Sequence, residues 1–315
     1  MTAMATRFRP YLPVALIALA VVLLPLVLPS AYYTRIATLV FTAALAVVGL
    51  NILMGYAGQV SLGHAGFFGI GAYAVAILPT HVGVHPVLAF VIGVAVAGVL
   101  AFVVGRPILR LRGHYLAVAT LGLGILIAMV LTNEIAWTRG PDGMAVERVA
   151  VGGLRVRSIQ TWYWVAGVTL VLGALIAVNL LESPTGRALR ALHDSEVAAR
   201  VLGVDVARAK LAAFVISAVY AAWAGAYLAW INAFVTPDMA SFLHSVELVT
   251  MVVLGGLGSI AGAVVGATVL TVLPQMLTVF HEYEHLLLGA IMMLVMIFLR
   301  AGIVPSLLAL VRRGR

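Results

Sequence analysis

Residues 86–105 read Pro-Val-Leu-Ala-Phe-Val-Ile-Gly-Val-Ala-Val-Ala-Gly-Val-Leu-Ala-Phe-Val-Val-Gly, without a single charged side chain. A helix that crosses the hydrocarbon core of a bilayer needs about 20 such residues. Strands of membrane barrels alternate apolar and polar residues, whereas this run is continuously apolar, which favours a helix. The run therefore predicts a transmembrane helix.

Similar runs recur along the whole chain of 315 residues. Hydrophobic residues make up 63% of the sequence and charged residues 10%, and the mean hydropathy is +1.14. Soluble domains carry about a quarter charged residues. Because backbone polar groups in lipid must be satisfied internally, we predict an all-α polytopic membrane protein. The sequence has no cysteine, which excludes disulfides and thiolate metal sites.

The chain as a whole, residues 1–315, is predicted to be a single transmembrane domain. Its predicted spans are 11–29, 35–54, 65–80, 86–105, 114–133, 162–181, 211–232 and 285–303. Residues 246–280 are long enough for two short crossings, hinged at the glycine-rich turn Gly255–Ser259. Together these runs give about 8–10 crossings, depending on whether 246–280 forms two spans or a re-entrant pair. We expect the first run to be retained as a helix and not cleaved as a signal peptide.

Lys and Arg residues favour one side of the predicted membrane. With the N-terminus in the cytoplasm, fourteen of them fall on the cytoplasmic side and five outside, as the positive-inside rule requires. Both termini are then cytoplasmic. The connection 182–210 faces the cytoplasm, and 134–161, with the turn Gly140–Gly143, faces outward. The net charge of +8 therefore serves orientation, and we expect no nucleic-acid partner.

The glycine-rich stretch 51–73 interrupts an apolar region with polar residues. Asn51, Gln59, Ser61, Gly63 and His64 lie at or next to this interruption. Close helix packing accounts for glycines such as Gly66, Gly69 and Gly71. Polar side chains at membrane depth need partners or a cavity, and broken helices commonly border transport pathways. We therefore take these five residues as candidates for a translocation pathway.

The cytoplasmic connection carries a short amphipathic segment over 187–202, which ends at Gly203. Leucine and valine recur at helical spacing between charges. Asp194 or Ser195 is placed to cap a second helical turn, and Gly203 suits a left-handed helix end. The segment has two interpretations, a solvated connector or a helix that docks on a cytoplasmic partner.

Several motifs resemble those of branched-chain amino-acid permeases of the LivM kind, which are subunits of ABC importers. In the cytoplasmic segment these are Gly186–Leu192 with Asp194, Glu196–Ala199 and Gly203, similar to the EAA-type loop that fits a cleft on the ATPase subunit. The remaining matches, in family order, are Gly55–Tyr73, Leu111–Leu121, Thr138–Gly143 and Met251–Ser259. The resemblance covers about residues 35–303. It implies that the coupling residues are Arg187, Arg190, Asp194, Glu196, Ala198, Ala199 and Gly203.

The same resemblance implies the partners and the location. These are a second homologous permease subunit, two cytoplasmic ATPase subunits and a periplasmic solute-binding protein, in the lipid of a bacterial inner membrane. The sequence has no Gly-x-x-x-x-Gly-Lys-Ser/Thr motif, so ATP and Mg²⁺ are expected on the ATPase and no cofactor on this chain. The chain is thus expected to be a transport subunit and not an enzyme. Expected solutes are branched-chain or related amino acids, with urea, amides or aromatic acids as alternatives.

Two other classes of function compete with this interpretation. His281 and His285, with Glu282, satisfy the spacing of a zinc helix, but no third ligand is evident nearby. An ion-coupled secondary transporter would need ionisable groups inside the membrane, and the predicted spans contain almost none. Glu247 starts a predicted span and is a candidate to face the pathway, although an acid at a helix N-terminus is an adequate alternative explanation.

Overall fold

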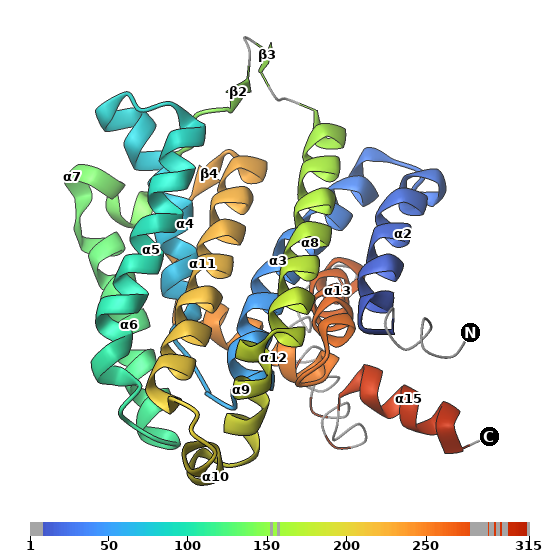
Figure 1. Cartoon of the computed structure of the whole chain (residues 1–315). Coiled ribbons are helices and arrows are strands. Elements are labelled where there is room, and N and C mark those ends of the chain that lie inside the picture. Colours follow the sequence, from blue (N-terminus) through green and yellow to red (C-terminus); the bar gives the residue numbers. More distant parts are fainter. Residues whose placement is uncertain are drawn as a thin grey trace.

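The computed structural model describes residues 9–151, 154–155, 158–277, 289, 293, 297 and 302–313. Most of them form helices (Figure 1). The predicted crossing 285–303 and the His281–His285 motif lie almost wholly outside the described residues. Among the described residues, no group of three or more His, Asp or Glu side chains is placed to hold a metal ion.

Within the described residues, six helical segments are long and apolar enough to cross a membrane. They are α3 (Ala31–Asn51, continued by a π-helical turn to Tyr56), α4 (His64–Ile77, continued to Val82), α5 (Pro86–Ile108), α6 (His114–Asn133), α8 (Ile159–Glu182) and α11 (Val206–Asn232). Three shorter apolar helices are α2 (Leu12–Val27), α12 (Phe242–Gly255) and α13 (Ile260–Leu277). The all-α membrane fold is confirmed, and the predicted spans within the described residues correspond to these helices.

Short elements close the two ends of the bundle. One end carries α9 (Pro184–Asp194) and α10 (Glu196–Val201), drawn at the bottom of Figure 1, and we call it the α9–α10 end. The opposite end carries α7 (Ile135–Thr138) and two small antiparallel ribbons, β1 (Met144–Ala145) with β4 (Phe234–Val235) and β2 (Ala150–Val151) with β3 (Leu154–Arg155). Single turns at Arg9–Tyr11, Gly140–Asp142 and Pro237–Ala240, and a last helix α15 (Ile303–Arg313), complete the description.

Helix α11 is the centre of the bundle, and α3, α4 and α5 pack around it. The approach of α4 is close because Gly71 faces the backbone of Ala222, and Gly225 faces the backbone of Phe68. A side chain at either glycine would collide with main-chain atoms. Without a hydrophobic driving force between helices in lipid, such small-residue contacts provide the packing. The glycine-rich sequence of α4 is therefore explained by its contact with α11.

Helices α5 and α6 form an outer wall, on the left of Figure 1. In their middle turns the exposed side chains are apolar, among them Val91, Val99 and Val103 on α5 and Val118, Leu126 and Val130 on α6. In a membrane protein, exposed apolar faces of this kind meet lipid tails. The wall therefore marks one lipid-facing side of the bundle.

Candidate transport pathway and coupling surface

The α3 helix and the α4 helix are separated by a non-helical stretch, residues 57–63, that ends deep in the bundle. His64, the first residue of α4, lies against Ser217 of α11. Ser217 is about 16 Å along α11 from Val206, at a rise of about 1.5 Å per residue. The chain therefore runs unwound from the α9–α10 end to membrane depth before α4 begins.

Buried polar contacts hold this unwound stretch in place. Ser61 Oγ lies 2.8 Å from His64 Nδ1, and His64 Nε2 lies 2.6 Å from Ser217 Oγ. Gln59 donates to the carbonyl of Ala57 at 2.9 Å. Gln59, Ser61 and His64 are all buried, and none of them lines the cavities described below. In this conformation, these three predicted pathway residues make hydrogen bonds within the protein and do not face these cavities.

Gly63 allows the start of α4 to approach α6. A Cβ atom at Gly63 would collide with the Thr120 carbonyl. The Thr120 hydroxyl accepts from the backbone N–H of Leu62 at 3.1 Å. The glycine is therefore required by close contact, and the neighbouring backbone donor is satisfied by a side chain of another helix.

Asn51, the last residue of α3, holds the turn between α12 and α13. Its side-chain amide donates to the Ser259 carbonyl at 2.8 Å and accepts from the Gly258 N–H at 3.0 Å. Asn51 is buried, and Gly258 has a positive φ of 72°, which glycine adopts without steric penalty. The glycine-rich hinge predicted at 255–259 is thus confirmed, with an anchor on a distant helix.

Helix α12 begins near the first turn of α4. The Ser245 hydroxyl accepts from the Ala65 N–H at 3.1 Å. With 14 residues, α12 is about 21 Å long, less than the roughly 30 Å of a hydrocarbon core. The starts of two helices therefore meet inside the bundle, an arrangement that borders binding sites in broken-helix transporters.

A cavity of about 670 Å³ opens beside this meeting point. Its apolar lining comes from α3, α4, α12 and α13 and includes Leu39, Phe68, Met251 and Leu270. His244 and Glu247 line it as well, and both also line a smaller neighbouring cavity with Asp238. The combined space offers apolar walls and a polar, acidic end.

His244 and Glu247 form the polar group of this cavity. His244 Nδ1 lies 3.1 Å from a carboxylate oxygen of Glu247, and the His244 ring stands edge-on to Phe68 at 4.9 Å between centroids. A carboxylate only accepts, so Nδ1 carries the proton. His244 Nε2 is buried and has no hydrogen-bond partner among the described residues. This nitrogen has almost no accessible surface, so the group of the pair that a ligand can reach is the Glu247 carboxylate, whose side chain is 55% exposed.

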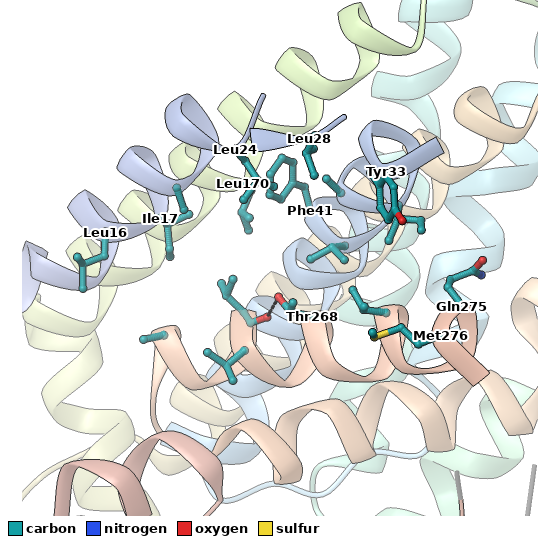
Figure 2. Close-up of a pocket in the computed structure, with 18 of the residues that line it drawn as sticks. Leu16, Ile17, Leu24, Leu28, Tyr33, Phe41, Leu170, Thr268, Gln275 and Met276 are labelled. Atoms are coloured by element: carbon teal, nitrogen blue, oxygen red, sulfur yellow. Dashed lines mark hydrogen bonds between the residues drawn. The ribbon is translucent and has the colours of Figure 1, made fainter. Parts of the chain in front are cut away.

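A larger cavity, of about 800 Å³, lies between α2, α3 and α13 (Figure 2). Leu16, Ile17, Leu24 and Phe41 line it, and its polar contacts come from Tyr32, Tyr33, Thr268 and Gln275. None of the described residues that line it is Asp, Glu, Lys, Arg or His. Because a buried charge without a counter-charge is strongly disfavoured, the cavity of His244 and Glu247 is the better candidate for a ligand that carries charge.

The sequence leaves two interpretations of Glu247, a residue that faces the pathway or an acid at a helix N-terminus. The second is wrong, because Glu247 lies in the second turn of α12, paired with His244, while Ser241 caps the helix. The sequence analysis does not single out His244, although a His and a Glu three residues apart in an apolar segment are a signal of a functional site in a membrane.

The amphipathic segment 187–202 lies in two helices, α9 and α10, and not in one. Ser195 is extended between α9 and α10, and its hydroxyl accepts from the Ala198 N–H at 3.2 Å. The predicted cap at this position is confirmed. Gly203 follows α10 with a φ of 82°, which confirms the left-handed end. The segment is therefore a connection of two short helices between α8 and α11.

The charged residues of α9 attach it to α8. Arg190 donates to the Leu181 carbonyl and lies 3.7 Å from the Glu182 carboxylate. Arg187 donates to the Glu182 carbonyl at 3.3 Å. Asp194 ends α9 and is exposed. Two of the predicted coupling residues thus fix the orientation of α9.

Glu196 and Ala199 face the bundle. The Glu196 carboxylate pairs with Lys210 of α11, which is almost fully buried, and lies 3.6 Å from Arg112. Ala199 is buried, while Ala198 is exposed. Removing the Glu196 side chain would leave the buried Lys210 ammonium without its partner, which would lower the free energy of unfolding by about 3–5 kcal/mol. Glu196 therefore connects α10 to α11.

The outer face of α10 is apolar. Val197, Val201 and Leu202 are 67%, 82% and 77% exposed. The sequence analysis does not name these three residues as coupling residues, although they belong to the amphipathic pattern of 187–202. An exposed apolar face of this kind is typical of a site that contacts another protein or the membrane.

Comparisons with known proteins agree with this architecture. Residues 32–296 match the family described as branched-chain amino acid transport system / permease component. The permease LivM of Escherichia coli is 36% identical over 294 residues, covering 86% of this chain and 69% of LivM. LivM of Salmonella typhimurium is 34% identical with the same coverage. LivH of Escherichia coli is 25% identical, covering 84% of this chain and 92% of LivH. No solved structure matches this chain.

Proposed function

This chain belongs to the family of branched-chain amino acid transport permeases, and from that premise we propose how it works with its partners. It is a transmembrane permease subunit of an ABC importer. It pairs with a second, homologous permease, as the similarity to both LivM and LivH suggests. Two cytoplasmic ATPases bind ATP and Mg²⁺, and a periplasmic protein delivers the solute to the bacterial inner membrane.

The apolar outer face of α10 carries this proposal. Val197, Val201 and Leu202 are exposed on a short helix between two spans, and the sequence has no P-loop of its own. A partner that hydrolyses ATP would cover this face. The ion-driven alternative has no comparable use for it.

The force would reach the membrane through α10 and α11. Glu196 ties α10 to Lys210 of α11, and α11 packs closely on α4 through Gly225 and Gly71. A shift of α10 would therefore move the first turn of α4, where it meets α12. In this scheme Asn51, Gln59, Ser61, Gly63 and His64 shape the pathway by holding the unwound stretch, which opens and closes the cavity beside it.

The solute is a branched-chain amino acid. The apolar walls of the cavity, including Leu39, Phe68 and Met251, suit an aliphatic side chain, and its polar end offers the exposed Glu247 carboxylate to an α-ammonium. Urea would leave these apolar walls without contact. The cavity therefore favours leucine-like solutes over urea.

Placing a charge on the apolar outer face of α10 tests the proposal. Val201→Asp or Leu202→Asp should reduce uptake of labelled leucine by about tenfold or more, because a charge in the centre of an apolar interface removes its main contacts. The same variants should lose the ATPase subunit on co-purification. Uptake in cells that express the complete transporter, and the composition of the purified complex, measure both effects.

A matched control is Val82→Asp, an exposed valine at the opposite end of the bundle. It should retain uptake and the ATPase. Glu196 and Ala199 are unsuitable test positions, because both contact the bundle itself. Normal uptake by Val201→Asp and Leu202→Asp, at normal membrane levels, would show that α10 is not the docking helix.

A further inference from the structure

A cavity of about 530 Å³ at the α9–α10 end is lined by an excess of cations. Among the described residues that line it, Glu196 is the only one with a carboxylate. Six of the lining residues are basic, namely Arg106, Arg110, Arg112, Arg200, Arg208 and Lys210. These residues come from the end of α5, the turn before α6, α10 and the start of α11. Helices that are far apart in sequence thus place their charges around one space.

Only part of this charge is neutralised within the chain. Glu196 pairs with Lys210 and Arg112, and Asp205 pairs with Arg208 at 3.0 Å. Arg106, Arg110 and Arg200 have no carboxylate within 4 Å among the described residues. Like charges held together repel one another. The cavity is therefore suited to an anion that supplies the missing negative charge.

The position of the cavity indicates where that anion comes from. It lies where the lipid-facing helix α5 ends, and Arg106 stacks over the ring of Phe102 at 4.2 Å, an exposed residue of that helix. Tyr115, 77% exposed in the first turn of α6, is the type of residue that lies at the level of lipid head groups. Acyl chains beside α5 would place their phosphates at the mouth of the cavity.

We propose that this cavity binds the phosphate head group of an anionic phospholipid. Arginine forms paired, charge-assisted hydrogen bonds with phosphate oxygens, and basic pockets between transmembrane helices bind such head groups. Arg200 and Glu196 of α10 line the cavity, but the docking residues Val197, Val201 and Leu202 do not. Anionic lipid therefore fits better than an acidic surface of the ATPase.

The lipid would also act on coupling, an extension that rests on the proposed function. Arg112 and Lys210 line the cavity and both contact Glu196 of α10. A bound phosphate would form ion pairs with the same cations that bind Glu196. The lipid site and helix α10 thus share one ion-pair network.

Lipid retention by the purified transporter tests the site directly. The complete complex in mild detergent is mixed with equal amounts of phosphatidylglycerol and phosphatidylcholine, and the bound lipids are counted by native mass spectrometry. The wild type should retain phosphatidylglycerol in preference to phosphatidylcholine. Arg106→Gln with Arg110→Gln should weaken this retention about tenfold or more. Arg139→Gln with Arg148→Gln, exposed at the opposite end, should leave it unchanged.

Three results would overturn the proposal. Equal retention of both lipids by the wild type would exclude a preference for anionic head groups. Displacement of phosphatidylglycerol by equal concentrations of glycerol phosphate or inorganic phosphate would identify a site for soluble phosphates. Loss of the ATPase from Arg106→Gln with Arg110→Gln, with lipid retention intact, would assign the cavity to the partner. No uptake enters this measurement, so its failure would leave the proposed transport function untouched.

Discussion

Glu247 is an acidic residue of the proposed solute cavity. Its side chain is 55% exposed, and His244 Nδ1 lies 3.1 Å from one of its carboxylate oxygens. Leu39, Phe68 and Met251 supply apolar walls to the same cavity. A carboxylate beside apolar walls suits the ammonium group and the aliphatic side chain of the proposed solute.

Glu247→Gln should lower leucine uptake by about tenfold or more, because a charge-assisted hydrogen bond contributes about 1.5–3 kcal/mol. The loss should appear chiefly as a raised KM for the transporter, measured by initial uptake rates over a range of leucine concentrations. Glu147→Gln, the same change at an exposed site of the opposite end, is the control. An unchanged KM in Glu247→Gln would move the binding site elsewhere.

Among single residues, the sequence predicts those whose role depends only on their position in one helix. Ser195 and Gly203 were predicted from their positions relative to one helix, and both fulfil those roles. The partners of Asn51 and Glu196 could not be predicted, since Ser259 and Lys210 are brought to them by packing between helices. Apolar residues such as Val201 carry no sequence signal that separates an outward face from an inward one.

At the scale of elements, the predicted spans of the described region match the helices because continuous apolar runs are a strong signal. The depth at which α4 and α12 begin was not predictable, since hydropathy records composition and not height in the membrane. That depth depends on contacts such as those of Gly225 and Gly71 between α4 and α11.

Gly225→Val should therefore separate α4 from α11. A side chain there meets the backbone of Phe68, and overpacking of this kind destabilises by about 1–3 kcal/mol or more. The melting temperature of the purified protein should fall by roughly 5 °C or more. Gly122→Val makes the same exchange in α6, where nothing lies within 4 Å, and should melt close to the wild type. Equal melting of the two variants would contradict the close α4–α11 contact.

At the scale of the whole molecule, the two ends of the bundle differ in charge. Arg106–Arg112 and Arg187–Lys210 gather at the α9–α10 end, which agrees with the predicted cytoplasmic side. On this charge bias we propose that the α9–α10 end is cytoplasmic.

Single cysteines can test the orientation, because the chain has none of its own. Thr185→Cys, at the α9–α10 end, should react with a membrane-impermeant maleimide in inside-out vesicles and not in intact spheroplasts. Glu147→Cys should show the opposite pattern. The wild type gives the background, and labelling after solubilisation shows that both cysteines are reactive. A reversed pattern would place the α9–α10 end outside.

The unwound stretch before α4 also bears on the order in which the chain is made. Ser217, the partner of His64, follows it by 153 residues, and Ser245, the partner of the Ala65 N–H, follows that residue by 180. A ribosome releases α4 into the membrane long before it has made either serine. Until then, the polar groups at the start of α4 cannot be satisfied as they are in the finished bundle, and lipid offers them no substitute. The growing chain must therefore keep this turn near water or within the insertion machinery until α11 and α12 arrive.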